Sequence, residues 1–226
     1  MVTSDSSVTH DTPAWADRAA ARSRSVQRSR IRSIEQAQTI VAAARRLLET
    51  EGSGFTTQQL SKEAGIALQT FYRHFASKDQ LLLAVFEDFL IEASARLAEA
   101  AMQLPDPVSR LRFYISSALH SLDGAQGAAP KFVTAEHWRL YQLFPTEMAG
   151  ANQSFADLIE QELRNATQEN LLHSADPAAD AWLATKLVMS VYHHYAFAPS
   201  PADTGDFGER LWSFCLAAFG GHLPER

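Results

Sequence analysis

Apolar residues recur every three to four positions along most of this chain, which is the spacing of amphipathic helices. The first such run begins after Ser33, where Ser33 and Gln36 fit a capping box, and Gly52 ends it. No segment alternates apolar and polar residues as a half-buried strand does. The pattern predicts an all-α protein of about nine helices. Their expected ranges are about 34–51, 57–64, 68–75, 78–104, 107–122, 130–143, 145–172, 177–197 and 207–219.

Local start signals support these ranges. A hydroxyl residue followed three positions later by Gln suggests capping at Thr56 and at Ser77. An Asp-Pro pair places an N-cap before a proline at the first helical position, and it occurs at Asp106 and again at Asp176. Each pair predicts where a helix begins.

The stretch FTTQQLSKEAGIALQTFYRHFASK, residues 55–78, predicts two short helices joined by a tight turn at Gly65, where a residue without Cβ most easily adopts positive φ. This is the pattern of a helix-turn-helix, whose second helix enters the major groove of DNA. The polar residues of that second helix are Gln69, Thr70, Tyr72, Arg73 and His74.

These side chains suit different parts of a duplex. Gln69 and Thr70 lie early in the helix, where Gln pairs with adenine and a Thr methyl contacts thymine. Polar tips on the later residues suit phosphates, and Thr57 and Lys78 sit at helix starts that favour anions. Alternatively, Tyr72 packs on the domain core and Gln69 is an ordinary exposed residue.

These motifs resemble the DNA-binding domain of the TetR family of transcriptional regulators over residues 34–82. The resemblance is carried by Thr56-Thr57, by Ala64-Gly65-Ile66 in the turn, by the run TFYRHF at 70–75, and by SKDQLL at 77–82. Ala67 and Gln69 depart from the usual pattern, and this departure bears on the operator sequence.

The resemblance implies more than the motifs do. It implies a homodimer formed through the last two helices, which would place two recognition helices on a pseudo-palindromic operator in double-stranded DNA. It also implies a C-terminal sensor domain for a small-molecule effector, and most often a repressor. The expected domains are an Arg-rich arm at 1–33, a DNA-binding domain at 34–82, and a ligand-sensing and dimerisation domain at 83–226.

Charge is divided along the chain in agreement with this organisation. Residues 1–78 carry 11 Lys and Arg against 7 Asp and Glu, whereas residues 79–226 carry 9 against 19. The arm is either disordered or extends the following helix in its second half. Arg28, Arg30 and Arg32 either enter an adjacent minor groove or belong to a solvated tail that adds nonspecific attraction.

Aromatic residues crowd the C-terminal part, where they form either core or an apolar cavity. Dimerisation would also use some of them, including Trp212, Phe214 and Phe219. The candidate ligand contacts, chosen by helical spacing, are Trp138, Tyr141, Trp182, Lys186, Met189 and His193. Because neighbouring helix positions point about 100° apart, His193 and His194 are poorly placed to share a metal ion, so no metal site is expected.

Other classes of protein find little support. The sequence shows no Gly-rich phosphate loop, nucleophile elbow or zinc spacing, so we expect neither an enzyme nor a cofactor. A single cysteine, the lack of a signal-like N-terminus and the lack of a long apolar run favour a cytoplasmic protein without a membrane partner. The alternative function is a dimeric DNA-binding or chromosome-organising protein without an effector.

Overall fold

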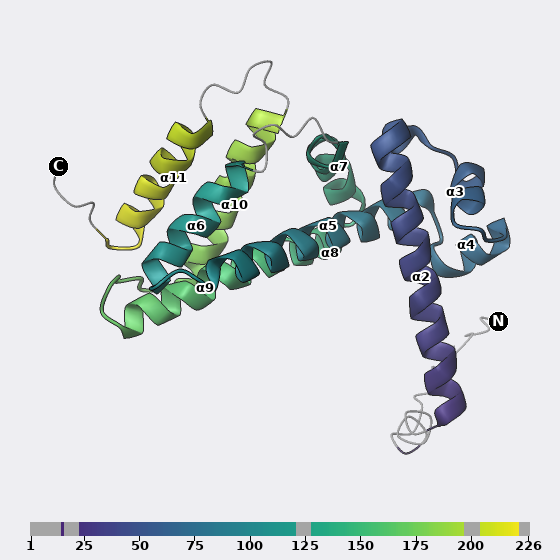
Figure 1. The fold of residues 1–226 in the computed structure, drawn as a ribbon, viewed down its shortest axis with the longest axis horizontal. Coiled ribbons are helices and arrows are strands. Elements are labelled where there is room, and N and C mark those ends of the chain that lie inside the picture. Colours follow the sequence, from purple (N-terminus) through teal and green to yellow (C-terminus); the bar gives the residue numbers. More distant parts are fainter. Residues whose placement is uncertain (1–14, 16–22, 121–127, 197–203, 222–226) are drawn as a thin grey trace, which may run out of the picture.

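The computed structural model describes Trp15 and residues 23–120, 128–196 and 204–221. These segments hold ten α-helices and one 3-10 turn, and no strand, so the all-α prediction is confirmed (Figure 1). In chain order the elements are α2 (Arg24–Glu51), η1 (Gly52–Gly54), α3 (Thr57–Glu63), α4 (Leu68–His74), α5 (Lys78–Ala101), α6 (Pro107–His120), α7 (Ala128–Leu143), α8 (Pro145–Ala151), α9 (Gln153–Gln168), α10 (Pro177–Ala196) and α11 (Thr204–Ala218).

The first helix is longer than predicted. α2 begins at Arg24, after Ser23 as N-cap, and passes through Ser33 without a break, so the capping box at Ser33 is wrong. Residues 24–33 contain neither Gly nor Pro, and their Arg and Gln residues favour a helix, so nothing local stops it. Of the two alternatives for the second half of the arm, helix extension is therefore confirmed from Arg24 onward. Residues 1–14 and 16–22 lie outside the described part.

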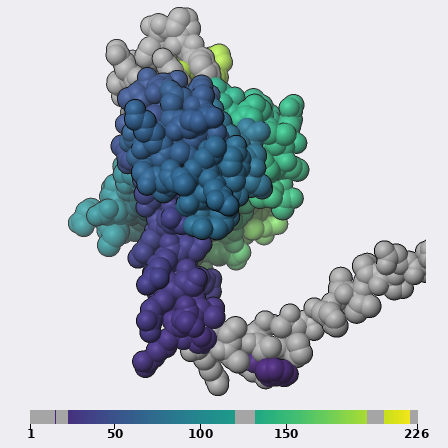
Figure 2. All heavy atoms as spheres, turned by 90° about the vertical axis from the view of Figure 1, so that its right-hand side faces the viewer, coloured from purple at the N-terminus to yellow at the C-terminus, as the bar shows by residue number. Residues whose placement is uncertain are grey.

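α2 changes character along its length. Its buried residues begin only at Ile40, and the turns before that expose Ile31 and Ile34. Figure 2 shows this purple half of the helix extending beyond the blue helix-turn-helix. The helix ends at Gly52, whose φ of +65° is a conformation that suits glycine.

The other start signals are confirmed by hydrogen bonds. Thr56 and Gln59 form a reciprocal capping box, and the Ser77 hydroxyl accepts from the Gln80 N–H. The carboxylates of Asp106 and Asp176 accept from the backbone N–H three residues later, at 2.8 and 3.1 Å. These signals could be read correctly because each cap depends on a few neighbouring residues.

The predicted helix over 145–172 is two helices, α8 and α9, and this split accounts for the tenth helix. They meet at Asn152, a buried residue at φ −81° and ψ −5° whose side-chain amide donates to the Met148 carbonyl at 3.2 Å. Met148 belongs to one hydrophobic cluster and Phe155 to another. The bend lets the two helices bury their apolar faces in different clusters.

Two buried clusters support the fold. The first joins α2, α3 and α4 to the start of α5 and to α7 and α8, with Ile40, Phe71 and Phe86 at its centre. The second joins the end of α5 to α6, α9, α10 and α11, with Ile115 and Phe219 fully buried. The long helix α5 runs from one cluster to the other (Figure 1). The first cluster thus crosses residue 82, where we expected a domain boundary.

Candidate nucleic-acid interface and ligand cavity

The helix-turn-helix consists of α3 and α4, joined through Gly65 at φ +65°. Phe71 fixes α4 to the domain because its ring is fully buried and stacks on Phe75, with ring centroids 6.0 Å apart. The ring of Tyr72 meets Phe71 edge-on at 4.9 Å, yet half of the Tyr72 side chain is exposed. Tyr72 therefore braces α4 with one ring edge and still presents surface to solvent.

The outer face of α4 carries the predicted reading residues. Gln69 and Arg73 are exposed, and Thr70 and His74 are half-buried. Thr57, at the first position of α3, is also half-buried. The structure thus brings the candidates on α3 and α4 into one small domain.

Gln36 of α2 ties the end of α4 in place. Its side-chain oxygen accepts from Arg73 Nη2 at 2.7 Å and from His74 Nε2 at 2.9 Å. A groove follows this contact between the two helices, and it is lined by Ser29, Arg32, Ser33, Glu35, Gln36, Thr39, Ile66, Arg73 and His74. No local pattern indicates this link, because Gln36 precedes its partners in the chain by more than 35 residues.

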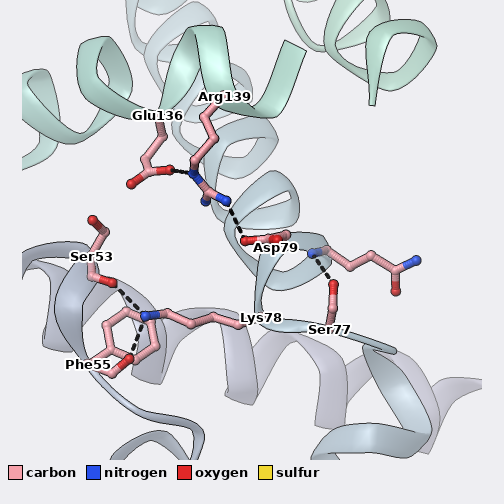
Figure 3. Close-up of polar contacts among 8 residues, drawn as sticks. Ser53, Phe55, Ser77, Lys78, Asp79, Glu136 and Arg139 are labelled. Atoms are coloured by element: carbon pink, nitrogen blue, oxygen red, sulfur yellow. Dashed lines mark hydrogen bonds and ion pairs between the residues drawn. The ribbon is translucent and has the colours of Figure 1, made fainter. Parts of the chain in front are cut away.

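Lys78 is placed differently from our prediction. Its ammonium donates to the carbonyls of Ser53 and Phe55, each at 2.5 Å, and lies 4.4 Å from the centre of the Phe55 ring (Figure 3). Burial lowers the pKa of this lysine. A phosphate contact would require the ammonium to leave both carbonyls, so in this structure Lys78 stabilises the turn between α2 and α3.

An adjacent ion-pair network joins this corner to α7. Arg139 donates to Asp79, the residue after Lys78, and to Glu136, both at 2.6 Å (Figure 3). The start of α5 is therefore held to the turn between α2 and α3 on one side and to α7 on the other.

Arg28, Arg30 and Arg32 lie on the exposed half of α2, and Arg32 also lines the groove beside α4. Helical geometry separates them, since Arg30 is about 200° around the axis from either neighbour. The three arginines therefore do not form one surface.

A cavity of about 460 Å³ lies in the C-terminal part, mostly between apolar side chains. It is lined by Phe89, Leu90, Ala93, Ser94, Arg96 and Leu97 of α5, Ser117 and Ala118 of α6, Val133 of α7, Asn152, Phe155 of α9, and Val188, Met189 and Tyr192 of α10. A volume in this range with a few polar groups suits a small molecule with a large apolar part.

Of the six predicted ligand contacts, only Met189 lines this cavity. Trp138 and Trp182 are 67% and 54% exposed, and Lys186 lies 5.6 Å over the Trp182 ring. Tyr141 packs against the first cluster. Helical spacing identified residues that share a face, but it carried no information on which face encloses space. The cavity residues that we missed, such as Phe89, have the same apolar periodicity as core residues.

His193 is half-buried and packs instead against the buried ring of His137. The ring centroids are 4.5 Å apart, and Nδ1 of His193 is 3.0 Å from the Thr134 hydroxyl. Burial is the main cause that lowers the pKa of His137, to about 4, and the positive charges of His193 and Lys186 act in the same direction. Within residues 23–120, 128–196 and 204–221, no three His, Cys, Asp or Glu side chains converge as metal ligands would.

One junction connects the cavity to α2. Arg45 donates to Asp88 at 2.6 Å and to Glu92 at 2.5 Å, and its guanidinium lies 4.3 Å from the centre of the Phe89 ring. Glu92 also accepts from Arg96. Because Phe89 and Arg96 both line the cavity, the cavity wall and the first helix of the helix-turn-helix domain share direct contacts.

The two last helices expose apolar side chains. Leu183 of α10 is 57% exposed and Phe214 of α11 is 67% exposed. Of the aromatic residues expected in a dimer contact, Trp212 and Phe219 are instead buried in the second cluster. Cys215 is also buried there, and burial raises the pKa of its thiol to about 11, so the thiol is unreactive near neutral pH. No helix of the described segments is both long and apolar enough to cross a membrane.

Comparison with known proteins supports the N-terminal assignment. Residues 40–85 match the family described as bacterial regulatory proteins, tetR family. The transcriptional regulator EthR of Mycolicibacterium smegmatis is 36% identical over 75 residues, which are 32% of this chain and 35% of that protein. The uncharacterised regulator YvaF of Bacillus subtilis is 40% identical over 53 residues, 24% of this chain and 28% of that protein. The chain thus matches only about a third of the length of these curated relatives.

Solved structures resemble the whole fold. FadR of Thermus thermophilus, a TetR-family repressor solved with lauroyl-CoA, has a TM-score of 0.64 at 18% identity, covering 84% of this chain and 97% of that one. RolR, solved with resorcinol, has a TM-score of 0.63 at 16% identity, covering 86% and 97%. At these identities the likeness concerns the fold alone.

Proposed function

This chain belongs to the TetR family of transcriptional regulators, and from that premise we propose that it binds double-stranded DNA through α4 and represses transcription until a small molecule releases it. The observation that carries the proposal is the outer face of α4. Gln69 and Arg73 are exposed there, while Phe71 anchors the opposite face in the core. A short helix held in this way is suited to the major groove.

Each candidate residue has a proposed role at the duplex. Gln69 and Thr70 read base edges. Tyr72, His74 and Thr57 contact phosphates and so fix the register of α4. Arg73 contributes charge beside them, although one of its nitrogens is held by Gln36. We assign Lys78 a positioning role because its ammonium is engaged with two backbone carbonyls.

The partner that completes the DNA-binding unit is a second copy of the chain. The exposed apolar residues of α10 and α11, with Leu183 and Phe214 foremost, support a homodimer through the last two helices. A two-fold dimer would place two α4 helices about one turn, ~34 Å, apart on a pseudo-palindrome.

The proposed effector is a small apolar or amphipathic molecule in the cavity of about 460 Å³. The lining supports this class because aromatic and aliphatic side chains predominate, and Ser94, Asn152 and Arg96 supply the few polar groups. The cavity also supports this function over that of a DNA-binding protein without an effector, since such a protein would have no need of an apolar pocket of this size.

The junction at Arg45 provides a physical route for release. An effector in contact with Phe89 and Arg96 touches the two side chains that also meet Arg45 or its partner Glu92. Displacing them favours a different position of α2, and with it of α4. Release requires only that the effector binds this second arrangement of α2 and α4 more tightly than the DNA-binding one. We expect Arg45→Gln to keep DNA affinity within a few-fold but to weaken the effect of effector on it; undiminished release would exclude Arg45 from the route.

The experiment that tests the proposal is selection of bound duplexes from a random pool by the full chain, followed by a screen for compounds that release the selected duplex. A pseudo-palindromic consensus and a releasing compound support a ligand-responsive regulator. A consensus that no compound releases would favour the alternative without an effector. Failure to bind any duplex at low salt would overturn the DNA-binding function itself.

A further inference from the structure

The N-terminal half of α2 buries no side chain in the core, and its hydrogen bonds to α4 are those of Gln36. Residues 24–39 precede the first buried residue, Ile40, and the helix extends there beyond the helix-turn-helix (Figure 2). Ordered helix without core contacts invites the question of what it touches. We propose that this half of α2 is a second DNA-binding element, a rigid arm that lies along the phosphate backbone beside α4. This inference rests on the proposed DNA-binding function.

Charge is distributed unequally in this segment. It contains four arginines and a single acidic residue, Glu35. Arg28 and Arg32 are exposed, and among the described residues no salt bridge engages them. Glu35 lines the groove beside α4, but Arg32 and Arg73 line it too, so positive side chains exceed negative ones there. The surface is therefore positive and available to a polyanion.

The arginines also lie in register with α4. Arg24, Arg28, Arg32 and Gln36 follow one another at intervals of four residues, about 6 Å along the axis, so they form one stripe. Gln36 is the residue that accepts from Arg73 and His74 of α4. The stripe thus continues the proposed DNA-contacting surface of α4 along α2.

Small residues accompany the stripe. Ser25, Ser29 and Ser33 lie beside the arginines on adjacent positions of the helix, and Ser29 and Ser33 line the groove next to α4. Short side chains allow a sugar-phosphate strand to approach closely, and hydroxyls donate hydrogen bonds to phosphate oxygens. The arginine side chains reach past them to neighbouring phosphates.

Helical structure also determines which part of the duplex the arm contacts. A helix with its side chains is about 10–12 Å across, whereas the minor groove is only about 6 Å wide. A helical arm that begins at Arg24 therefore cannot thread the minor groove, as a flexible arm would. Contacts to phosphates carry no base information, so the arm should add affinity without sequence preference.

Arg30 provides the internal control. It is exposed on the same helix and carries the same charge as its neighbours. Two residues correspond to about 200° of rotation, so Arg30 points away from the stripe that holds Arg28 and Arg32. If the arm contacts DNA through one face, replacing Arg30 should affect binding less than replacing Arg28 or Arg32. If the arginines act only by general electrostatic attraction, all three replacements should have the same effect.

The test measures affinity for the selected duplex as a function of salt, using the full chain and its Arg28→Gln, Arg32→Gln and Arg30→Gln variants. Gln preserves helix propensity, and far-UV circular dichroism checks that helicity is retained. Each phosphate contact contributes about 0.9 to the slope of log K against log[salt]. With two arms per dimer, Arg28→Gln and Arg32→Gln should each reduce the slope by about 1.8, on every duplex sequence tested. Arg30→Gln should leave the slope unchanged.

Three other outcomes would refute the proposed DNA-binding role of the arm. Unchanged slopes for Arg28→Gln and Arg32→Gln, with sequence-selective binding retained, would refute this inference and leave the proposed function intact. An equal decrease of the salt slope for Arg30→Gln would show that the arginines act by general electrostatic attraction and not by contacts of one helix face. Absence of any duplex binding by the unaltered chain would refute both the proposed function and the arm.

Discussion

The buried residue His137, which packs against the half-buried His193, makes the stability of the protein depend on pH. His137 is only 7% exposed, and its ring lies against Phe86, Trp138 and His193. Its Nδ1 and the Nε2 of His193 are buried without a hydrogen-bond partner in the described part of the chain. A proton added to His137 would place a charge in a poorly solvated site beside His193, so the folded protein resists protonation there.

The size of the effect follows from the pKa of His137, which falls from 6.5 to about 4 on folding. Between these values the unfolded chain binds a proton that the folded chain does not, so stability decreases as pH falls below about 6.5. The full loss is about 3 kcal/mol, of which about 2 kcal/mol appears between pH 7.5 and pH 5.0. Burial also lowers the pKa of His193, which adds a loss of the same sign.

The window near pH 5 separates this effect from the titration of Glu92 in its ion pair with Arg45. The hydrogen bond from Arg45 lowers the pKa of Glu92, so the stability it contributes is lost only as pH falls below about 4.5. Urea unfolding at pH 7.5 and pH 5.0, at one protein concentration, measures the decrease. His137→Leu should lessen the decrease by about 2 kcal/mol, whereas His194→Leu, at an exposed site on α10, should not. An equal decrease in His137→Leu and the unaltered protein would refute the assignment.

Three further predictions concern DNA reading, the turn and the cavity. Lys78→Met should lower stability by about 2 kcal/mol because two charged hydrogen bonds are lost, and the same change at exposed Lys62 should cost less than about 0.5 kcal/mol; equal urea midpoints would contradict this. Gln69→Ala should reduce discrimination at one base pair by about 1–3 kcal/mol in competition binding, and equal losses on all duplexes would remove Gln69 from base reading. Ala93→Trp should fill the cavity and abolish release by effector while DNA binding persists, unlike Ala95→Trp on the exposed face of α5; release at an unchanged effector concentration would place the ligand elsewhere.

Features set by neighbouring residues were predictable from the sequence. The caps at Thr56 and Ser77 and the turn at Gly65 depend on residues within one or two turns, and all three are confirmed. The helix-turn-helix could be identified for the same reason, since its turn and its buried Phe71 are local signals.

Features set by distant residues were not predictable. The break at Asn152 is one of them, because the two clusters that α8 and α9 pack into lie on either side of it. Lys78 meets carbonyls more than 20 residues earlier in the chain, which no spacing rule indicates. The cavity residues illustrate the same limit, since a side chain such as Phe155 shows identical periodicity whether its face meets other side chains or lines the cavity.

The position of the cavity explains how a small ligand could affect a distant helix. Its wall combines residues of the first cluster, such as Phe89 and Met189, with residues of the second, such as Leu97 and Phe155. The first cluster holds α4, and the second holds the helices proposed to pair with another subunit. An occupant therefore lies where these two packed bodies meet, and filling that space changes how one rests on the other. Because packed interiors deform little, such a change would shift a whole cluster as a unit instead of being absorbed by small movements of its side chains. In a dimer joined through the second clusters, the two copies of α4 would then change their separation together.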